Sequence, residues 1–333
     1  QGLHLRRLTK GPAVLFRGRK ASSSELLGID VVIPDFTYLE ENRDRIAGVF
    51  LTHGHADAVG ALPYFLQNID APVFGSKLTI ALAKYYVDSS NVVKGFDDYH
   101  EVTENTEIDF PTATVKFFKT THTIPDSLAI VIKTSEGNIV YTGDFKFDQS
   151  AAVEYQTNFG RIADVGEDYV LALLSDSSDA ESTVENVSDR KVAETMLETF
   201  LNAEGRIIVA CVASNILRIQ QVINAAFESG RKIFLTGSEL EEIVNIALSL
   251  NKLTVPDKEL IVNFNQMKKL ADDELVILET GNAGEPIKAL QKMALGRHRQ
   301  VNLHEGDLVY IATTPSVAME TQIARTKDLI YRA

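Results

Sequence analysis

The 333 residues carry a formal net charge of −13, and 45% of them are hydrophobic and 24% charged. This balance is typical of a soluble globular protein, and the length suffices for two domains with cores of their own. The negative charge argues against a protein that coats nucleic acid through bulk charge, although it leaves room for a local basic groove. Because no apolar run approaches the roughly 20 residues that cross a bilayer and no secretory signal is found, we expect a cytoplasmic protein without a membrane partner.

The first part of the chain, from about residue 28 to residue 178, alternates short β-rich runs with loops and helical patterns. Apolar runs predict strands over residues 45–52 and 71–76, and a helical pattern follows from residue 77. Residues 112–122 predict a strand that ends at His122. Residues 127–144 predict a hairpin whose second strand ends at Asp144, and residues 170–177 predict a further strand.

The second part, from about Val184, shows regular strand–helix alternation. Helices are predicted over residues 190–202, 214–230 and 238–250, and strands over residues 206–213, 231–237, 274–281 and 306–313. Such repetition indicates a mostly parallel sheet with helices packed on it, and it places a domain boundary near residues 180–186.

Cys211 is the single cysteine and lies in one of these apolar strand runs. One cysteine excludes an internal disulfide framework and a Cys-based zinc cluster, so we expect a buried, inert thiol.

Candidate metal ligands follow three of the predicted strands: His53 and His55 after the first, His122 after another and Asp144 after the hairpin. A His-x-His pair on a turn lets two imidazoles converge on one ion at about 2.0–2.1 Å, which suits zinc. Asp57, one turn into the following helix, is positioned to reach a second ion. Unrelated loop histidines are the alternative, and four suitable residues at strand ends make it the weaker one.

These residues lie in motifs that resemble a known family. "LTHGHADAVGALPY" resembles the HxHxDH motif of the metallo-β-lactamase fold, with Ala58 in place of the final histidine. "TTHTIPDSLAIVIKTSEGNIVYTGDFKFDQS" is similar to the later His and Asp motifs of ribonuclease J, and "SNILRIQQVINAA" and "ETGNAGEPIKALQKMA" are similar to stretches of its β-CASP domain. The resemblance runs from about Leu26 to Ala333. Because it has Ala58 at this position, the chain resembles in particular the degenerate second paralogue of Gram-positive bacteria.

The resemblance implies an α/β protein: a metallo-β-lactamase fold (an αββα sandwich, incomplete here) over residues 1–183 and an inserted β-CASP domain with a mostly parallel sheet over residues 184–333. It implies a two-zinc ribonuclease with 5′→3′ exonuclease and endonuclease activities in mRNA turnover and rRNA maturation. His53, His55, His122 and Asp144 would hold the first zinc. Asp57 and Asp144 would serve the second, where they are also the catalytic candidates.

Three departures from the family pattern bear on activity. Ala58 has no donor atom, so we expect zero or one bound Zn²⁺ and weak or lost activity. Residues 1–25 match nothing expected of the family. The closing lactamase segment, with its later histidines, and the small C-terminal domain are expected to follow Ala333 and are absent from this chain.

Several further residues are candidates for contacts with RNA phosphate. Lys146 follows Asp144, the run Ser214–Asn215 opens a predicted helix with Arg218 nearby, and Gly281 and Gly284 lie in a glycine-rich turn. Each has an ordinary alternative, as a solvated strand residue, a helix cap or a simple turn. Asp126 and Ser127 either orient His122 or belong to a turn after a proline. His298 and His304 are expected at the surface, and His100 has no evident partner.

Two hypotheses for function follow. The protein is either a slow ribonuclease or a non-catalytic subunit that binds the active ribonuclease J paralogue and modulates RNA turnover. RNA, a second copy of the chain and that paralogue are therefore the expected partners. A small-molecule hydrolase of the same fold is a poorer reading, because it does not account for the helix-rich second domain.

Overall fold

The computed structural model describes residues 13–16, 31–178, 180–181, 187–280, 286–312 and 320–333. The chain forms two compact units, residues 1–103 and 104–333. The predicted domain boundary at residues 183 and 184 falls inside the second unit and stays a prediction. Among the described residues, no helix has the length and apolarity needed to cross a membrane.

The first unit is built on short parallel strands. β1 (Ala13–Phe16) pairs with β2 (Val31–Pro34), and β3 (Val49–Phe50), β4 (Val73–Gly75) and β5 (Tyr99–Glu101) form a three-stranded sheet in that order. Its helices are α1 (Thr37–Glu41), α2 (Ala56–Val59), α3 (Leu62–Leu66) and α4 (Lys77–Ser90). Val59, Val73 and Ile80 lie in the core between them, and this packing sets the start of the loop that carries His53.

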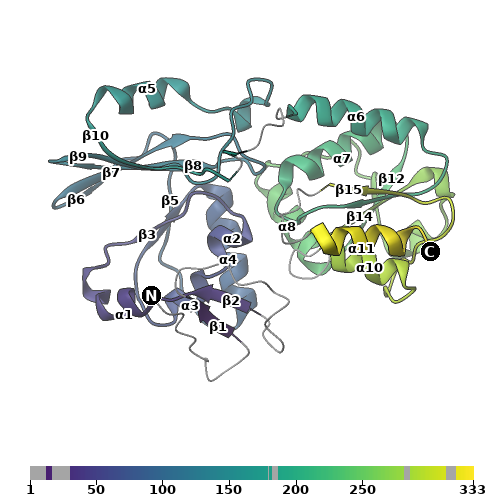
Figure 1. Ribbon diagram of the computed structural model, residues 1–333, viewed down its shortest axis with the longest axis horizontal. Helices are drawn as coiled ribbons and strands as arrows, with labels where there is room; N and C mark the ends of the chain where they lie inside the picture. Colours follow the sequence, from purple (N-terminus) through teal and green to yellow (C-terminus); the bar gives the residue numbers. More distant parts are fainter. Residues whose placement is uncertain (1–12, 17–30, 179, 182–186, 281–285, 313–319) are drawn as a thin grey trace. The chain divides into compact units, whose positions relative to one another are not determined.

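The second unit begins with a mixed five-stranded sheet in the order β10-β9-β8-β7-β6. Its strands are β6 (Ile108–Phe110), β7 (Ala113–Lys119), β8 (Leu128–Thr134), β9 (Gly137–Tyr141) and β10 (Val170–Leu174). The predicted hairpin is confirmed as the antiparallel pair β8 and β9. Helix α5 (Phe159–Glu167) covers one face, where Ile162 and Val165 pack on Phe118 and Val140 (Figure 1).

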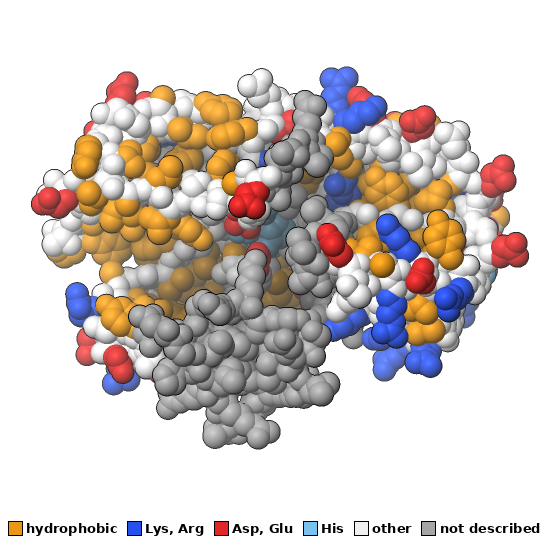
Figure 2. Space-filling view, in the orientation of Figure 1, with side chains coloured by type: hydrophobic (Ala, Val, Ile, Leu, Met, Phe, Trp, Pro, Cys, Tyr) orange, Lys and Arg blue, Asp and Glu red, His pale blue; other side chains and the backbone are white. Residues whose placement is uncertain are grey.

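Strand β10 forms an edge of this sheet and pairs with β9 in parallel. Four of its five residues are exposed, and Leu173 is 64% exposed. Figure 2 shows hydrophobic side chains gathered over this part of the second unit, and the exposed residues include Phe147, Phe159 and Tyr169. A contiguous apolar surface of this kind is unusual for a protein surface that faces water.

The rest of the second unit is a five-stranded parallel sheet in the order β13-β12-β14-β11-β15, which confirms the predicted parallel arrangement. The strands are β11 (Ile207–Ala210), β12 (Lys232–Thr236), β13 (Ile261–Val262), β14 (Leu275–Glu279) and β15 (Leu308–Ile311). The helices are α6 (Asp189–Asn202), α7 (Ile216–Glu228), α8 (Ser238–Ser249), α9 (Phe264–Met267), α10 (Pro286–Ala294) and α11 (Glu320–Ile330). Helices cover both faces of the sheet (Figure 1), so β11 and β14 are buried along their whole length.

Candidate metal centre

His53 and His55 lie on the short loop between β3 and α2. His53 is 3% exposed, and its Nδ1 lies 2.9 Å from the Thr52 hydroxyl. The two rings meet edge to face with centroids 5.1 Å apart. A hydrogen bond to the second ring nitrogen is the usual way in which a protein orients an imidazole for a metal.

His122 follows β7 and Asp144 follows β9, the two strands that flank β8 in the mixed sheet. The residue before His122, Thr121, pairs in an antiparallel bridge with Lys146, and the Lys146 N–H donates to the Thr121 carbonyl oxygen at 2.9 Å. Thr121 is further fixed by the buried hydroxyl of Thr157, which accepts from its N–H at 2.9 Å. The loops of His122 and Asp144 are therefore held side by side by backbone contacts.

Three of the predicted ligands form a group that could hold a metal ion. His53, His55 and His122 each offer one ring nitrogen, and these atoms lie within 4.8 Å of one another. Three imidazoles are a donor set that suits zinc. Within the part of the chain that the structure describes, Asp57 and Asp144 are not members of this group.

Asp57 and Ala58 occupy the first turn of α2 and are both exposed. The Ala58 N–H donates to the His55 carbonyl oxygen at 3.0 Å, as expected in a helical turn. The Ala58 side chain is a methyl group and supplies no donor, so the position at which the motif requires a histidine cannot coordinate metal.

Asp176 is a candidate that sequence reasoning missed. It follows β10, the strand beside β9, and so lies at the strand end next to that of Asp144. A hydrogen bond from the Ser178 hydroxyl lowers the pKa of Asp176; backbone N–H groups of Ser178 and Phe145 and the charge of His122 act in the same direction, against a smaller opposing effect of burial. The rule that selected His122 and Asp144, a ligand residue just after a strand, would have found Asp176 in "LLSDS".

Among the predicted RNA-binding residues, Lys146 has a protein partner. Its ammonium group lies 2.5 and 2.6 Å from the two carboxylate oxygens of Asp189. A lysine held in this way is a weaker candidate for a phosphate contact than an unpaired one, and its role in binding RNA stays a prediction.

The start of α7 has the geometry of an ordinary helix cap. The Asn215 side chain accepts from the Arg218 N–H at 3.0 Å, Ser214 is buried, and an Arg218 Nη group donates to Gln221 at 2.7 Å. Phosphate binding by these three residues stays a prediction. Gly281 and Gly284 lie outside the described residues.

Three other sequence expectations have clear outcomes. Asp126, a candidate orienter of His122, pairs instead with Lys252, and the Ser127 hydroxyl donates to the Ile124 carbonyl oxygen. His298, expected at the surface, is partly buried: its side chain is 15% exposed, and its Nε2 lies 3.4 Å from the buried carboxylate of Glu279. Cys211 is buried as predicted, and burial raises the pKa of its thiol to about 12.

Comparisons with known families match most of the chain. The metallo-beta-lactamase superfamily model matches residues 21–190, and the model of the ribonuclease J beta-CASP domain matches residues 204–330. The first match includes the strands β2 to β10, and the second includes the strands β11 to β15.

Related proteins share high sequence identity with this chain. A protein named Ribonuclease J 2 from Streptococcus pyogenes serotype M3 is 53% identical over 320 residues, and proteins of the same name from Staphylococcus epidermidis and Staphylococcus aureus are 43% identical. These alignments cover 96% of this chain but 57–58% of the relatives, so the chain spans little more than half the length of those proteins.

A crystal structure of a protein of unknown function from Enterococcus faecalis V583 is similar in fold, with a TM-score of 0.61 at 14% identity. The similarity covers 98% of this chain and 82% of that one. At this level of identity it supports the fold alone.

Proposed function

Because the chain belongs to the metallo-β-lactamase superfamily and, within it, to the ribonuclease J family, we propose that it acts in RNA processing or degradation with weak or lost hydrolytic activity of its own. One observation carries the proposal: three imidazoles gather as a metal group, while the adjacent motif position, Ala58, has no ligand atom. The first feature favours metal binding, and the second favours an incomplete two-metal site.

The proposed metal residues are His53, His55, His122 and Asp144 for a first zinc, with Asp57 and Asp144 directed to a second. A bound zinc ion lowers the pKa of a water ligand and polarises a phosphoryl oxygen. The protein's own contribution is to hold the imidazoles: Thr52 orients His53, and the Thr121–Lys146 bridge fixes the start of the His122 loop. With Ala58 in place of histidine, a second ion would lack one ligand, and transition-state charge would be less well stabilised.

The proposal of an RNA substrate is supported by the β-CASP match and by local charge. Although the net charge is −13, Lys288, Lys292, Arg297 and Arg299 are all exposed on or just after α10. Figure 2 shows Lys and Arg side chains gathered on this part of the surface. Local clusters of cations attract a polyanion even when the whole chain is acidic.

The second candidate function is a non-catalytic subunit that binds an active ribonuclease J paralogue, or a second copy of itself, and modulates RNA handling. Ala58 favours it, because a protein under selection only for assembly has no need of a complete second metal site. One bound zinc ion fits both candidates, whereas none fits only the non-catalytic subunit, so metal content must be measured together with cleavage.

The test is the substitution Ala58→His in the full-length protein, with Ala56→His as a matched control on the same helix. We expect the unmodified protein to bind at most one zinc ion by elemental analysis and to cleave RNA slowly. Ala58→His should add a second zinc ion and raise the cleavage rate by about two orders of magnitude or more, the scale of a lost electrostatic or acid–base group. Two zinc ions in the unmodified protein would contradict the proposal, and an inactive Ala58→His variant would favour the subunit.

A further inference from the structure

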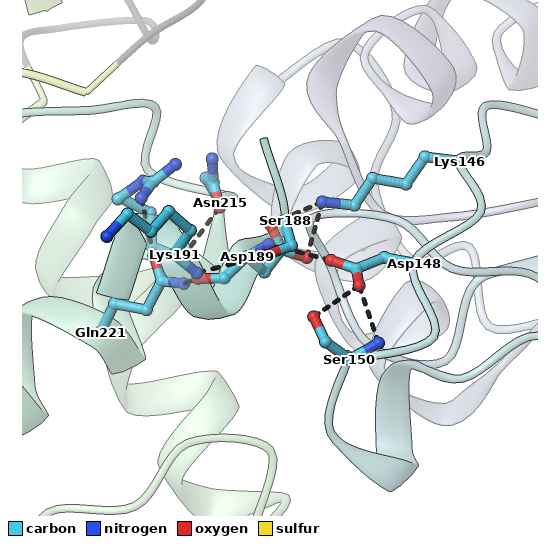
Figure 3. Close-up of polar contacts among 9 residues, drawn as sticks. Lys146, Asp148, Ser150, Ser188, Asp189, Lys191, Asn215 and Gln221 are labelled. Atoms are coloured by element: carbon cyan, nitrogen blue, oxygen red, sulfur yellow. Dashed lines mark hydrogen bonds and ion pairs between the residues drawn. The ribbon is translucent and has the colours of Figure 1, made fainter. Parts of the chain in front are cut away.

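The loop that follows Asp144 is tied to α6, the helix that precedes the β-CASP match at residues 204–330. Lys146 and Asp148 reach from this loop toward Asp189, the first residue of α6 (Figure 3). The Lys146 ammonium group contacts both carboxylate oxygens of Asp189, and the Asp189 N–H donates to Asp148 at 2.9 Å. Asp189 thus accepts hydrogen bonds through its carboxylate and donates one through its N–H, and both kinds of contact join the loop to α6.

This tie is well enclosed and continues into α7. The side chain of Asp189 is 12% exposed and that of Lys146 is 30% exposed. The Gln221 side chain on α7 donates to the Asp189 carbonyl oxygen at 2.9 Å, as the arrangement in Figure 3 makes visible. The backbone of Asp189 is therefore held both by its own helix, α6, and by α7.

The loop of His122 is tied to the part of the chain that matches the β-CASP domain by two other contacts. Lys252, just after α8, lies 2.7 Å from the carboxylate of Asp126, and the two side chains are 25% and 15% exposed. The Leu217 N–H, in the first turn of α7, donates to the carbonyl oxygen of Thr123 at 3.1 Å. Asp126 has φ of 61°, in the left-handed region that few residues other than glycine adopt, so the loop has an unusual backbone shape that outside contacts hold in place.

An ion pair on the same unit serves for comparison. Lys133 and Asp168 pair at 2.7 Å on the mixed sheet, but their side chains are 48% and 52% exposed. Exposed pairs of this kind contribute little and constrain little. The Lys146–Asp189 and Lys252–Asp126 pairs are far better shielded, and breaking such a pair leaves a charge with poor access to water.

We propose that Asp189 and Lys252 are positioning residues for the two metal-binding loops. Through Lys146 and Asp126 they hold the loops of Asp144 and His122 in place, so that α6 and the β-CASP helices set the affinity of the metal centre. This role rests on the proposed metal function. With this role, the β-CASP domain has a second function in addition to the proposed contact with RNA.

The experiment measures zinc affinity by calorimetric titration of the metal-free, full-length protein. Asp189→Asn and Lys252→Met remove one charge from each tie, and Asp168→Asn and Lys133→Met remove the same charges from the exposed pair. We expect each tie variant to bind zinc about tenfold more weakly or worse, the usual cost of losing an outer partner of a metal ligand. The exposed-pair variants should stay within about twofold of the unmodified protein, and Lys252→Arg, which keeps the pair, should bind like it.

The outcomes separate the two proposals. Zinc binding by the unmodified protein with equal affinity in all four variants would overturn the positioning role and leave the metal function intact. No zinc binding by the unmodified protein would overturn the metal function and the positioning role with it. Lys252→Met repeats the test at an independent tie if Asp189→Asn fails to fold, and amide exchange of residues 119–127 and 141–148 in metal-free protein should quicken in the tie variants alone.

Discussion

The two five-stranded sheets of the second unit use similar sequences in opposite surroundings. β14, with the sequence LVILE, lies between β11 and β12 and is buried at every residue. β10, with the sequence VLALL, lies at the edge of its sheet and is mostly exposed. An apolar run therefore predicts a strand well, but it does not predict whether other elements of the chain pack over that strand.

The ion pairs of the two sheets differ in the same way. Arg206 and Asp307 join β11 to the approach of β15 through two hydrogen bonds of 2.8 and 2.6 Å, with the side chains 13% and 2% exposed. Lys133 and Asp168 pair at a similar distance, but at the solvent-exposed surface. Equal geometry in different surroundings has different energetic consequences, because burial removes the solvent that would stabilise an unpaired charge.

The largest effect is expected from Leu278→Ala in β14. The side chain is fully buried, so its truncation leaves a cavity and should lower the free energy of unfolding by about 3–5 kcal/mol. The matched change Leu173→Ala in β10 should cost less than about 1 kcal/mol in this chain, because that side chain is already exposed. Urea denaturation followed by circular dichroism measures both, and equal losses would contradict the contrast between the sheets.

The next effect is expected from Arg206→Met. It leaves the buried Asp307 carboxylate without its guanidinium partner and should cost about 3 kcal/mol, the lower end for a broken buried pair, because the His304 N–H still donates to Asp307. Asp168→Asn on the exposed pair should leave the urea midpoint unchanged. A shift of the midpoint in Asp168→Asn as large as that in Arg206→Met would show that burial does not decide the strength of these pairs.

Sequence reasoning succeeded where local pattern decides structure. Helix α6 begins and ends within one residue of its prediction, because its apolar period and its Ser188 cap are both local. It failed near His53: the strand expected over residues 45–52 is only Val49–Phe50, and both of these residues are only partly buried. An apolar run by itself therefore fixes neither the burial nor the length of a strand.

The candidate site was predictable up to the point where distant elements meet. The strand-end rule selected His122 and Asp144 and would have selected Asp176. Lys146 and Asp189 are 43 residues apart, and Lys252 and Asp126 are 126 apart. No periodicity or motif joins such residues, because the pairing depends on how the β-CASP helices pack against the loops of the mixed sheet.

The smallest effect is expected on the pH dependence of stability, from the Asp148 carboxylate that accepts the Asp189 N–H. Partial burial acts to raise the pKa of Asp148, but hydrogen bonds from Ser150 and from the Asp189 N–H, with the charge of Lys146, hold it below its usual value. A carboxyl group whose pKa is lowered in the folded state stabilises the protein above its unfolded pKa of about 3.9 and loses that contribution as the pH falls through the folded value. Asp148→Asn should therefore lower stability at pH 7 by less than about 1 kcal/mol after solvent screening. Urea midpoints of this variant and the unmodified protein should converge as the pH is lowered toward 3, and a gap that stays constant would mean that Asp148 acts through shape and not through charge.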